Sequence, residues 1–183
     1  SGVTTMGWMF YGAYSFNQDL GWCVGDDQDL DLAFYNTPCE STSCGVLQGD
    51  ACAPTPRPVP NPTPQPAPAP TLLPIPNPTP RPVQLTNYVM TDSNIKTAVA
   101  AWLADPTAAE ATYGHISTWE TSGVTDMDEL FCAGDYCDYY NSGAASFNED
   151  ISSWDTSGVT RMDWMFWGAS SFNQNIGGWS VEN

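Results

Sequence analysis

The same order of apolar and polar positions recurs in three stretches of the chain, at 1–22, 122–154 and 157–179. The first and third stretches are identical at 14 of their first 18 positions. Corresponding tryptophans lie 25 residues apart in one step and 35 in the other, because the second stretch carries an insert at 132–143. A period of about 20–29 residues is typical of leucine-rich-repeat solenoids, in which each repeat forms one coil stacked on the next. The pattern therefore predicts a repeat solenoid.

The apolar positions of each copy predict the core of such a solenoid. We expect the inward-pointing side chains to be Val159, Met162, Met165, Phe166, Phe172, Ile176 and Trp179, with their equivalents Val3, Met6, Met9, Phe10, Phe16, Leu20 and Trp22. One asparagine follows the last phenylalanine of every copy, at Asn17, Asn148 and Asn173. A turn asparagine can satisfy backbone groups of its own coil and of the neighbouring one, whereas contact with a polysaccharide is the alternative role.

A helical pattern precedes the second set of repeats. The helical spacing i, i+3, i+4, i+7, i+8 is followed by Ile95, Ala98, Val99, Trp102 and Leu103. Thr91, Asp92 or Ser93 can serve as the N-cap, and Asp105-Pro106 should end the helix. A helix at this place can cover the exposed apolar edge of a first coil, as a capping element must.

The proposed domains follow from these elements and from a block of proline. We predict a last coil with a cysteine-rich C-terminal cap at 1–53, a polyproline II stalk at 54–82, and a helical N-terminal cap with first coils at 83–183. The fold class is a leucine-rich-repeat-like β solenoid with a short helical cap, in two partial domains joined by the rod. The chain is then expected to be a slice of a longer protein that alternates domains and stalks.

A coil cut in this way needs a neighbour on its open face, because bare strand edges and apolar stacking faces do not persist in water. The expected neighbour is either a further domain of the same polypeptide or another molecule of the same protein. The second alternative gives a homopolymeric fibre. This hypothesis requires three residues of one copy to stack against three of another: Val3, Met6 and Phe10 against Val159, Met162 and Phe166.

Composition narrows the classes of function. The net charge is −17 with four basic residues, which disfavours nucleic acid or an anionic membrane as partner. No run of about 18 apolar residues occurs, so we expect no membrane insertion. Catalytic and phosphate-binding motifs are lacking and the only histidine is His115, so we expect no enzyme activity and no cofactor. The run Asp26, Asp27, Asp29 and Asp31 is read as a solvated loop, with calcium binding as the alternative.

The six cysteines predict disulfides and an oxidising compartment. With one histidine, a zinc site is a weaker interpretation. Cys132 and Cys137 should pair because no other cysteine lies in that half of the chain, whereas the pairing of the other four stays open. Those four are Cys23, Cys39, Cys44 and Cys52.

In the block from Pro54 to Pro82, proline takes nearly every second position. Alternating X-Pro favours polyproline II, and at about 3.1 Å per residue the block would span roughly 90 Å. A stiff spacer is the plain interpretation, and a ligand for SH3-like domains the less favoured one. The composition resembles the hydroxyproline-rich glycoproteins of algal and plant cell walls, which implies O-linked sugars. Asn61 and Asn77 precede proline and so form no usable sequon. The candidate acceptors are Pro54, Pro56, Pro58, Pro60, Pro62, Pro64, Pro66, Pro68, Pro70, Pro74, Pro76, Pro78, Pro80 and Pro82, with Thr55, Thr63, Thr71 and Thr79.

Outside the proline block, the motifs SFNEDISSWDTSGVTRMDWMF and TDSNIKTAVAAWLADP resemble BspA-like surface proteins. That family has repeats of the form W-D-x-S-x-V-T-x-M-x-x-M-F-x-x-A-x-x-F-N-x-D-I and occurs in bacterial and mycoplasma lipoproteins, with expansions in unicellular algae. The ending LGWCV…FYNTPCESTSCGV looks like the boundary of algal members. The resemblance implies a leucine-rich-repeat-type solenoid, an extracellular or cell-surface setting, and a role in adhesion or surface structure.

Two functions follow, from different classes. The first is a structural subunit of an extracellular glycoprotein filament or appendage, favoured by the long stalk between short domains. The second is an adhesin or a module that binds carbohydrate or protein through a solenoid face. The second rests on aromatic residues that can grip sugars or a partner if they are exposed, namely Trp8, Tyr11, Tyr14, Trp164 and Trp167.

Overall fold

Short elements and turns dominate the computed structural model, which describes residues 2–52 and 88–181. The segment 53–87, which includes the predicted stalk and every candidate glycosylation site, lies outside the described residues. The elements in chain order are β1 (Cys23–Val24), η1 (Glu40–Gly45), β2 (Leu47–Gln48), η2 (Gly49–Cys52), β3 (Val89–Thr91), α1 (Ile95–Ala104), α2 (Pro106–Tyr113), η3 (Ile116–Thr118), β4 (Glu120–Gly123) and η4 (Ser142–Ser146).

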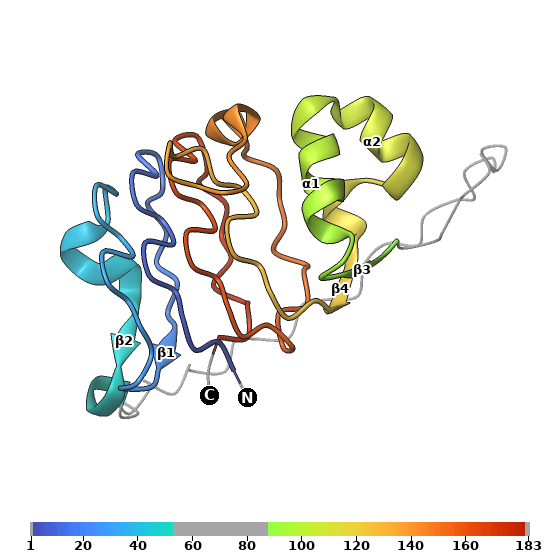
Figure 1. Ribbon diagram of the computed structural model, residues 1–183. Helices are drawn as coiled ribbons and strands as arrows, with labels where there is room; N and C mark the ends of the chain where they lie inside the picture. Colours follow the sequence, from blue (N-terminus) through green and yellow to red (C-terminus); the bar gives the residue numbers. More distant parts are fainter. Residues whose placement is uncertain (1, 53–87, 182–183) are drawn as a thin grey trace, which may run out of the picture. The chain divides into compact units, whose positions relative to one another are not determined.

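The chain is arranged as four layers stacked side by side. In spatial order, the first layer is 120–154, the second 155–179, the third 2–24 and the fourth 25–48. The blue trace of the N-terminal residues therefore lies next to the red trace of the C-terminal ones (Figure 1). Parallel β-bridges join each layer to the next: Asp126 pairs with Arg161, Arg161 with Thr5, and Thr5 with Asp29. The spatial order of the layers is thus not their order in the chain.

One hydrogen-bond pattern joins each layer to the next. Between the first and second layers the amide of Phe131 donates to Met165 O (2.8 Å). Between the second and third, the amide of Phe166 donates to Met9 O (2.8 Å), and between the third and fourth the amide of Phe10 donates to Ala33 O (2.8 Å). Because the pattern is the same at all three junctions, it does not depend on whether the layers are continuous in the chain.

Phenylalanine columns run through the core perpendicular to the layers. Phe131, Phe166, Phe10 and Phe34 follow one another with ring centroids 5.4, 5.3 and 5.7 Å apart. A second column joins Phe147, Phe172 and Phe16, with both spacings 5.9 Å. The inward-pointing side chains predicted from the repeat are all buried. Every layer therefore shields the apolar face of its neighbour from water, which is the main stabilising term for such a stack.

Within the segment 1–53, where a last coil and a cysteine-rich cap were predicted, residues 25–48 form a further layer of the stack. Phe34 continues the first phenylalanine column, and the amide of Gly12 donates to Tyr35 O (2.9 Å) as in the other layers. The Cys39–Cys44 disulfide lies beside Phe16 of the third layer, with Cys39 Sγ 3.4 Å from Phe16 O. This segment therefore forms a further layer although it keeps few of the repeat's residues.

The helical cap differs from the prediction in two details. Helix α1 buries Ile95, Ala98, Val99 and Trp102 as expected, but it begins after Asn94, which is not one of the proposed N-cap residues. Asp105-Pro106 ends α1 and also starts α2, because the Asp105 carboxylate accepts from the amide of Ala108 (3.1 Å) and Pro106 occupies the first turn. Proline is favoured there, since its missing N–H has no helical partner in any case.

The expected division into two partial solenoid domains differs from the structure. Ser1–Cys52 and Asn87–Asn183 belong to one compact unit, and Ala53–Thr86 to a second. The physical reason lies in the repeat itself. Since the two copies nearest the ends are nearly identical, the open face of the third layer fits the second layer of its own chain, which is always present at a high effective concentration.

Candidate functional site: the layer junction and an outer aromatic stripe

The six residues predicted to mediate assembly meet at the junction between the second and third layers. They are Val3, Met6, Phe10, Val159, Met162 and Phe166, and each is at most 1% exposed. The rings of Phe10 and Phe166 are stacked with an interplanar angle of 8°. In the structure both sides of the contact belong to the same chain, whereas the prediction assigned them to two copies.

An asparagine ladder crosses this junction and the one between the first and second layers, as the sequence predicted for these residues. Asn148 Oδ1 accepts from the amide of Asn173 (2.8 Å), and Asn173 Oδ1 accepts from the amide of Asn17 (3.0 Å). Gln174 and Gln18 reinforce it, because each donates its side-chain amide to the asparagine carbonyl of the preceding layer. These asparagines therefore satisfy backbone groups of the neighbouring layer.

The junction between the second and third layers differs at its tryptophan from the junction between the first and second layers, which are continuous in the chain. The indole N–H groups of Trp154 and Trp179 donate to Ile116 O (2.9 Å) and Ile151 O (3.2 Å) of the preceding segments. The equivalent indole N–H of Trp22 is buried and has no hydrogen-bond partner within the described part of the chain. A buried unsatisfied donor costs about 1–3 kcal/mol, so this junction is bonded less completely than the continuous one.

Three disulfides hold the loops. Cys132 pairs with Cys137, as predicted, and the pairing left open by the sequence is Cys23 with Cys52 and Cys39 with Cys44. Cys23–Cys52 ties β1 to η2 and so holds the end of the fourth layer. Three disulfides are compatible with an extracellular or cell-surface location. Among the described residues, no helix is both long and apolar enough to cross a bilayer.

Aromatic side chains also form a stripe outside the two phenylalanine columns, and Trp167 is its buried member. It crosses three layers and the disulfide-bonded insert, and its members are Tyr35, Tyr11, Trp8, Trp164, Trp167 and Tyr136. The ring centroids of Tyr35 and Tyr11 are 5.0 Å apart, and those of Tyr11 and Trp8 are also 5.0 Å apart. Trp164 and Trp167 meet at 4.5 Å. Sequence reasoning named four of these residues but missed Tyr35 and Tyr136. The signal for Tyr35 was its place after Phe34, which matches Tyr11 after Phe10.

A left-handed turn presents the stripe to the surface. Trp8 and Trp164 have φ of 58° and 59°, and Leu32 and Glu129 occupy the same turn in the other layers with φ of 49° and 60°. Left-handed backbone is uncommon for such residues, so its recurrence shows that the turn is imposed by the layer hydrogen bonds. Trp8 and Trp164 are half-buried, which leaves part of each ring exposed.

Aspartates form a second row of side-chain hydrogen bonds across the layers. Asp128 Oδ1 accepts from the amide of Asp163 (2.9 Å), and Asp163 Oδ1 accepts from the amide of Gly7 (2.8 Å). Burial, together with the nearby Asp126 carboxylate, raises the pKa of Asp128 to about 6, although the amide of Asp163 and the Arg161 guanidinium favour its charged form. This row crosses the same junctions as the phenylalanine columns.

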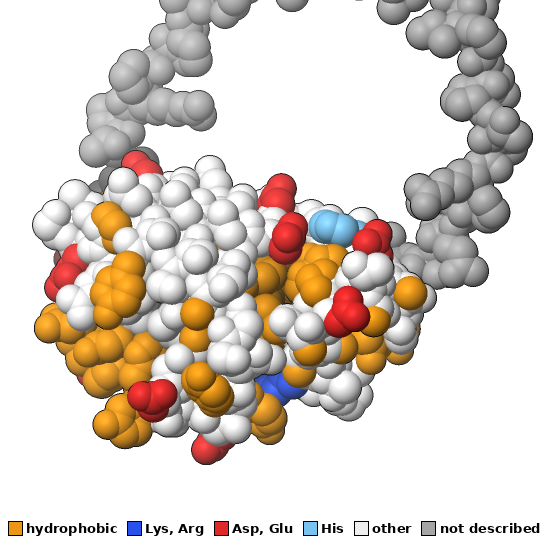
Figure 2. All heavy atoms as spheres, turned by 90° about the horizontal axis from the view of Figure 1, so that it is seen from above, with side chains coloured by type: hydrophobic (Ala, Val, Ile, Leu, Met, Phe, Trp, Pro, Cys, Tyr) orange, Lys and Arg blue, Asp and Glu red, His pale blue; other side chains and the backbone are white. Residues whose placement is uncertain are grey.

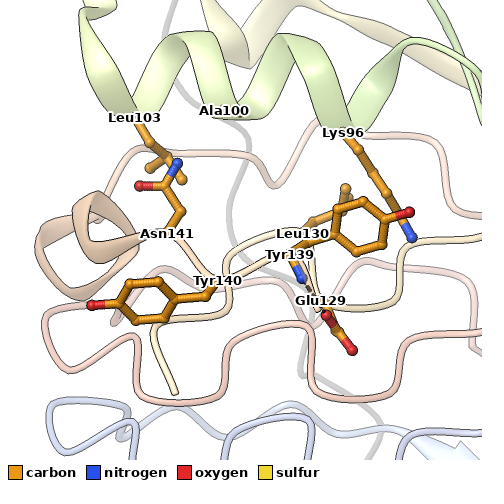
Figure 3. A pocket seen from close by; sticks show the side chains of 8 residues that line it. All are labelled: Lys96, Ala100, Leu103, Glu129, Leu130, Tyr139, Tyr140 and Asn141. Carbon is orange, nitrogen blue, oxygen red and sulfur yellow. Dashed lines mark hydrogen bonds between the residues drawn. The ribbon is translucent and has the colours of Figure 1, made fainter. Parts of the chain in front are cut away.

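A shallow pocket of 160 Å³ lies between α1 and the insert (Figure 3). The Lys96 ammonium group stands 4.2 Å from the centroid of the Tyr139 ring, and Glu129 accepts a hydrogen bond from the amide of Tyr139 (2.8 Å). Tyr140 points away from these groups in Figure 3. The lysine and the glutamate are thus already engaged within the chain, and the pocket presents no arrangement of reactive groups.

The remaining candidates take structural places. In the acidic run, Asp29 Oδ1 accepts from the amide of Asp31 (2.9 Å). No group of three or more His, Cys, Asp or Glu side chains in the described ranges could hold a metal ion. His115 caps η3 through Ser117 and meets the Trp102 ring edge-on, in keeping with a structural role.

Comparisons with known proteins place the chain in a family. No curated protein and no solved structure matches it. The model of one protein family, described as "Mycoplasma protein of unknown function, DUF285", matches residues 1–43 and 107–183, about two thirds of the chain. The match covers all three repeat copies and stops short of the proline block, which agrees with the resemblance to BspA-like surface proteins at the family level. The chain belongs to the DUF285 family.

Proposed function

We propose that the protein is a structural subunit of an extracellular glycoprotein filament or surface appendage. The stack of layers acts as a solenoid of the leucine-rich-repeat type, and the proline-rich segment acts as an O-glycosylated rod, as in the algal proteins that the sequence resembles. The observation that carries this proposal is the junction between the second and third layers. It joins groups 156 positions apart in the chain with the hydrogen-bond pattern of a continuous junction.

Such a junction can form equally well between two molecules. Exchange of an identical element between copies is a low-cost route to assembly, because the interactions that one molecule gives up are made again with the other. The third and fourth layers of one copy would then stack on the second layer of the next copy, and repetition would give a fibre. One feature favours exchange: the segment 53–87 separates the two parts in sequence.

A covalent staple tests this mode of assembly. The amide and hydroxyl of Thr4 both donate to Thr160 O, at 2.8 and 3.0 Å, so Thr4→Cys with Thr160→Cys can lock the junction within one chain. The matched control is Thr125→Cys with Thr160→Cys, which staples the first layer to the second inside one part of the chain; Thr160 donates to Thr125 O there as well. Light scattering and electron microscopy then follow assembly under oxidising conditions.

We expect the first staple to abolish filaments and the control staple to leave them unchanged. Reduction should restore assembly of the first variant. Equal assembly of both stapled variants would refute exchange at this junction, and an unmodified protein that stays monomeric at all concentrations would refute the filament itself.

The glycan part of the proposal is tested separately. The candidate acceptors lie outside the described residues, and the support is the alternating X-Pro composition together with the spoiled sequons at Asn61 and Asn77. Mass spectrometry of native material should show hydroxylation and pentose or hexose additions within 54–82. An unmodified mass for this segment would refute its glycosylation. A circular dichroism spectrum without the polyproline II signal would refute the rod.

The alternative function is an adhesin or a binding module. One observation favours it: the aromatic stripe is partly exposed and crosses three layers of the stack and the insert. A glycan array probed with the monomeric, stapled protein distinguishes the alternatives, because an adhesin should bind specific glycans without assembling.

A further inference from the structure

We infer that the aromatic stripe is a docking surface for the apolar interruption of the proline-rich segment of a second copy. This interruption is the sequence Leu72-Leu73-Pro74-Ile75, where the alternation of proline with small or polar residues is broken by large aliphatic side chains. The inference rests on the proposed function in one respect: assembly into a filament brings a second copy close to the stripe. The contact itself is independent of the layer junction.

The stripe is preorganised. Trp8 is in contact with Tyr11, Trp164 and Trp167 at centroid distances of 5.0, 6.0 and 5.7 Å, so its ring is held from three sides. Backbone hydrogen bonds fix the turns that carry it: the amide of Trp8 donates to Asp31 O (2.8 Å) and that of Trp164 to Gly7 O (3.0 Å). Rings held in this way lose little conformational freedom when a partner binds.

The insert builds one end of the surface. A Cβ atom on Gly134 would come within 2.8 Å of the Trp167 ring, so this glycine allows the backbone of the insert to lie directly on the indole. The Cys132–Cys137 disulfide closes the loop, and Tyr136 stacks on Trp167 at 5.8 Å while staying 79% exposed. The longer period of this repeat therefore has a consequence: it places one more ring at the end of the stripe.

An extended proline-rich chain suits such a surface chemically. Proline-rich segments dock on aromatic side chains because proline fixes φ in advance and little entropy is lost on binding. Leucine and isoleucine add apolar anchors that bury well against rings. Leu72, Leu73 and Ile75 also carry no acceptor for O-linked sugar, so glycosylation of neighbouring residues would leave these apolar side chains unmodified.

Charge supports the same partner. The segment 53–87 contains Arg57 and Arg81 and no acidic residue, whereas the rest of the chain holds all 21 acidic residues and two basic ones, a net charge of −19. Three carboxylates adjoin members of the stripe in sequence or in the hydrogen-bond ladder: Asp31, Asp135 and Asp163. Acidic side chains outnumber basic ones on the face of the molecule drawn in Figure 2, in keeping with this net charge. A cationic chain is therefore attracted to a surface that repels a second folded unit.

The first test uses a synthetic peptide of residues 66–81 and the full chain. Titration of tryptophan fluorescence should show saturable binding. We expect Trp164→Ala to weaken it at least tenfold, and Tyr139→Ala, an exposed aromatic outside the stripe, to leave it unchanged. A peptide with Leu72→Ser, Leu73→Ser and Ile75→Ser should bind at least tenfold more weakly. Circular dichroism must show that the variants fold, and Trp164→Phe offers a milder second variant if alanine unfolds the chain.

Equal binding to the Trp164 variants, or equal binding of the serine peptide, would overturn the docking site. The source of the segment is tested in the full chain by dilution. A fluorescence change that depends on concentration, and is lost when the three aliphatic residues are replaced by serine, supports a second copy; one independent of concentration would overturn this assignment. Assembly of the stapled variants is a separate result, so failure of the docking site leaves the filament proposal standing, and the reverse also holds.

Discussion

The inner phenylalanine columns and the outer aromatic stripe have nearly the same spacing but different surroundings. Phe10 and Phe166 are 5.3 Å apart and fully buried, whereas Trp8 and Trp164, two positions earlier in the same copies, are 6.0 Å apart and half-buried. The inner position is phenylalanine in all four layers, but the outer turn holds Leu32 and Glu129 in the other two. Burial against two neighbouring layers restricts the inner residue. The outer residue is free to serve another role.

The largest expected effect breaks the inner column. Phe166→Ala removes a ring that contacts Phe10, Phe131 and Phe172 at 5.3, 5.4 and 4.1 Å. We expect the free energy of unfolding to fall by about 3–5 kcal/mol, because a buried cavity adds to the lost transfer energy. Urea denaturation followed by circular dichroism measures this, and a loss below about 1 kcal/mol would contradict the importance of the column.

The aspartate row that crosses the layer junctions should give a pH effect. Burial raises the pKa of Asp128 to about 6, above its unfolded value of 3.8, so the folded state holds this proton more tightly. The stability from this proton is present below about pH 4 and is lost as the pH rises through 6. Asp128→Asn should therefore gain stability relative to the unmodified chain between pH 4 and pH 7, by on the order of 2 kcal/mol.

Paired denaturation curves at several pH values isolate this group, because other carboxylates titrate equally in both proteins. Hydrogen bonds from Ser152 and Ser157, for example, lower the pKa values of Asp150 and Asp155, and their contribution is lost as the pH falls. A stability difference that does not change with pH would show that Asp128 stays ionised in the fold.

The asparagine ladder lies outside the columns but crosses the same junctions. Asn173→Ala removes the acceptor for the amide of Asn17 and the partner of the Gln18 side chain. We expect a loss of about 1–2 kcal/mol, since these backbone groups can partly turn to water. Glu149→Ala, an exposed change one position after Asn148, serves as the control. Equal melting temperatures for the two variants would show that the ladder does not contribute to the stability of the fold.

The smallest effect on stability should come from the stripe. Trp164→Ala removes a half-buried ring without opening the phenylalanine column, so we expect a loss of about 1 kcal/mol or less in urea denaturation. A loss as large as that of Phe166→Ala would show that Trp164 stabilises the fold as much as the phenylalanine column does, which would contradict a separate binding role for the stripe.

The sequence predicted the inner columns and the asparagine ladder because a residue that faces the same neighbour in each layer must recur at the same place. It did not predict the fourth layer, where Phe34 and Tyr35 keep their places but the methionines and the asparagine are lost. Helix α2 was missed because Pro106 was read only as a stop, although proline also starts helices. The sequence could not predict whether the third layer packs on a layer of its own chain or of another copy. The two repeat copies are nearly identical, so the contact would look the same in both cases.

The spatial order of the layers has a consequence for the order of folding. Residues 88–181 join their two layers to a helical cap through short connections, whereas the junction with the third layer must bring together groups 156 positions apart. The entropy lost in closing a loop grows with its length, and distant contacts form late. We expect the cap with the first two layers to fold quickly and the N-terminal part to dock in a slower phase. At high concentration that phase should become faster, because a neighbouring molecule can then supply the missing part.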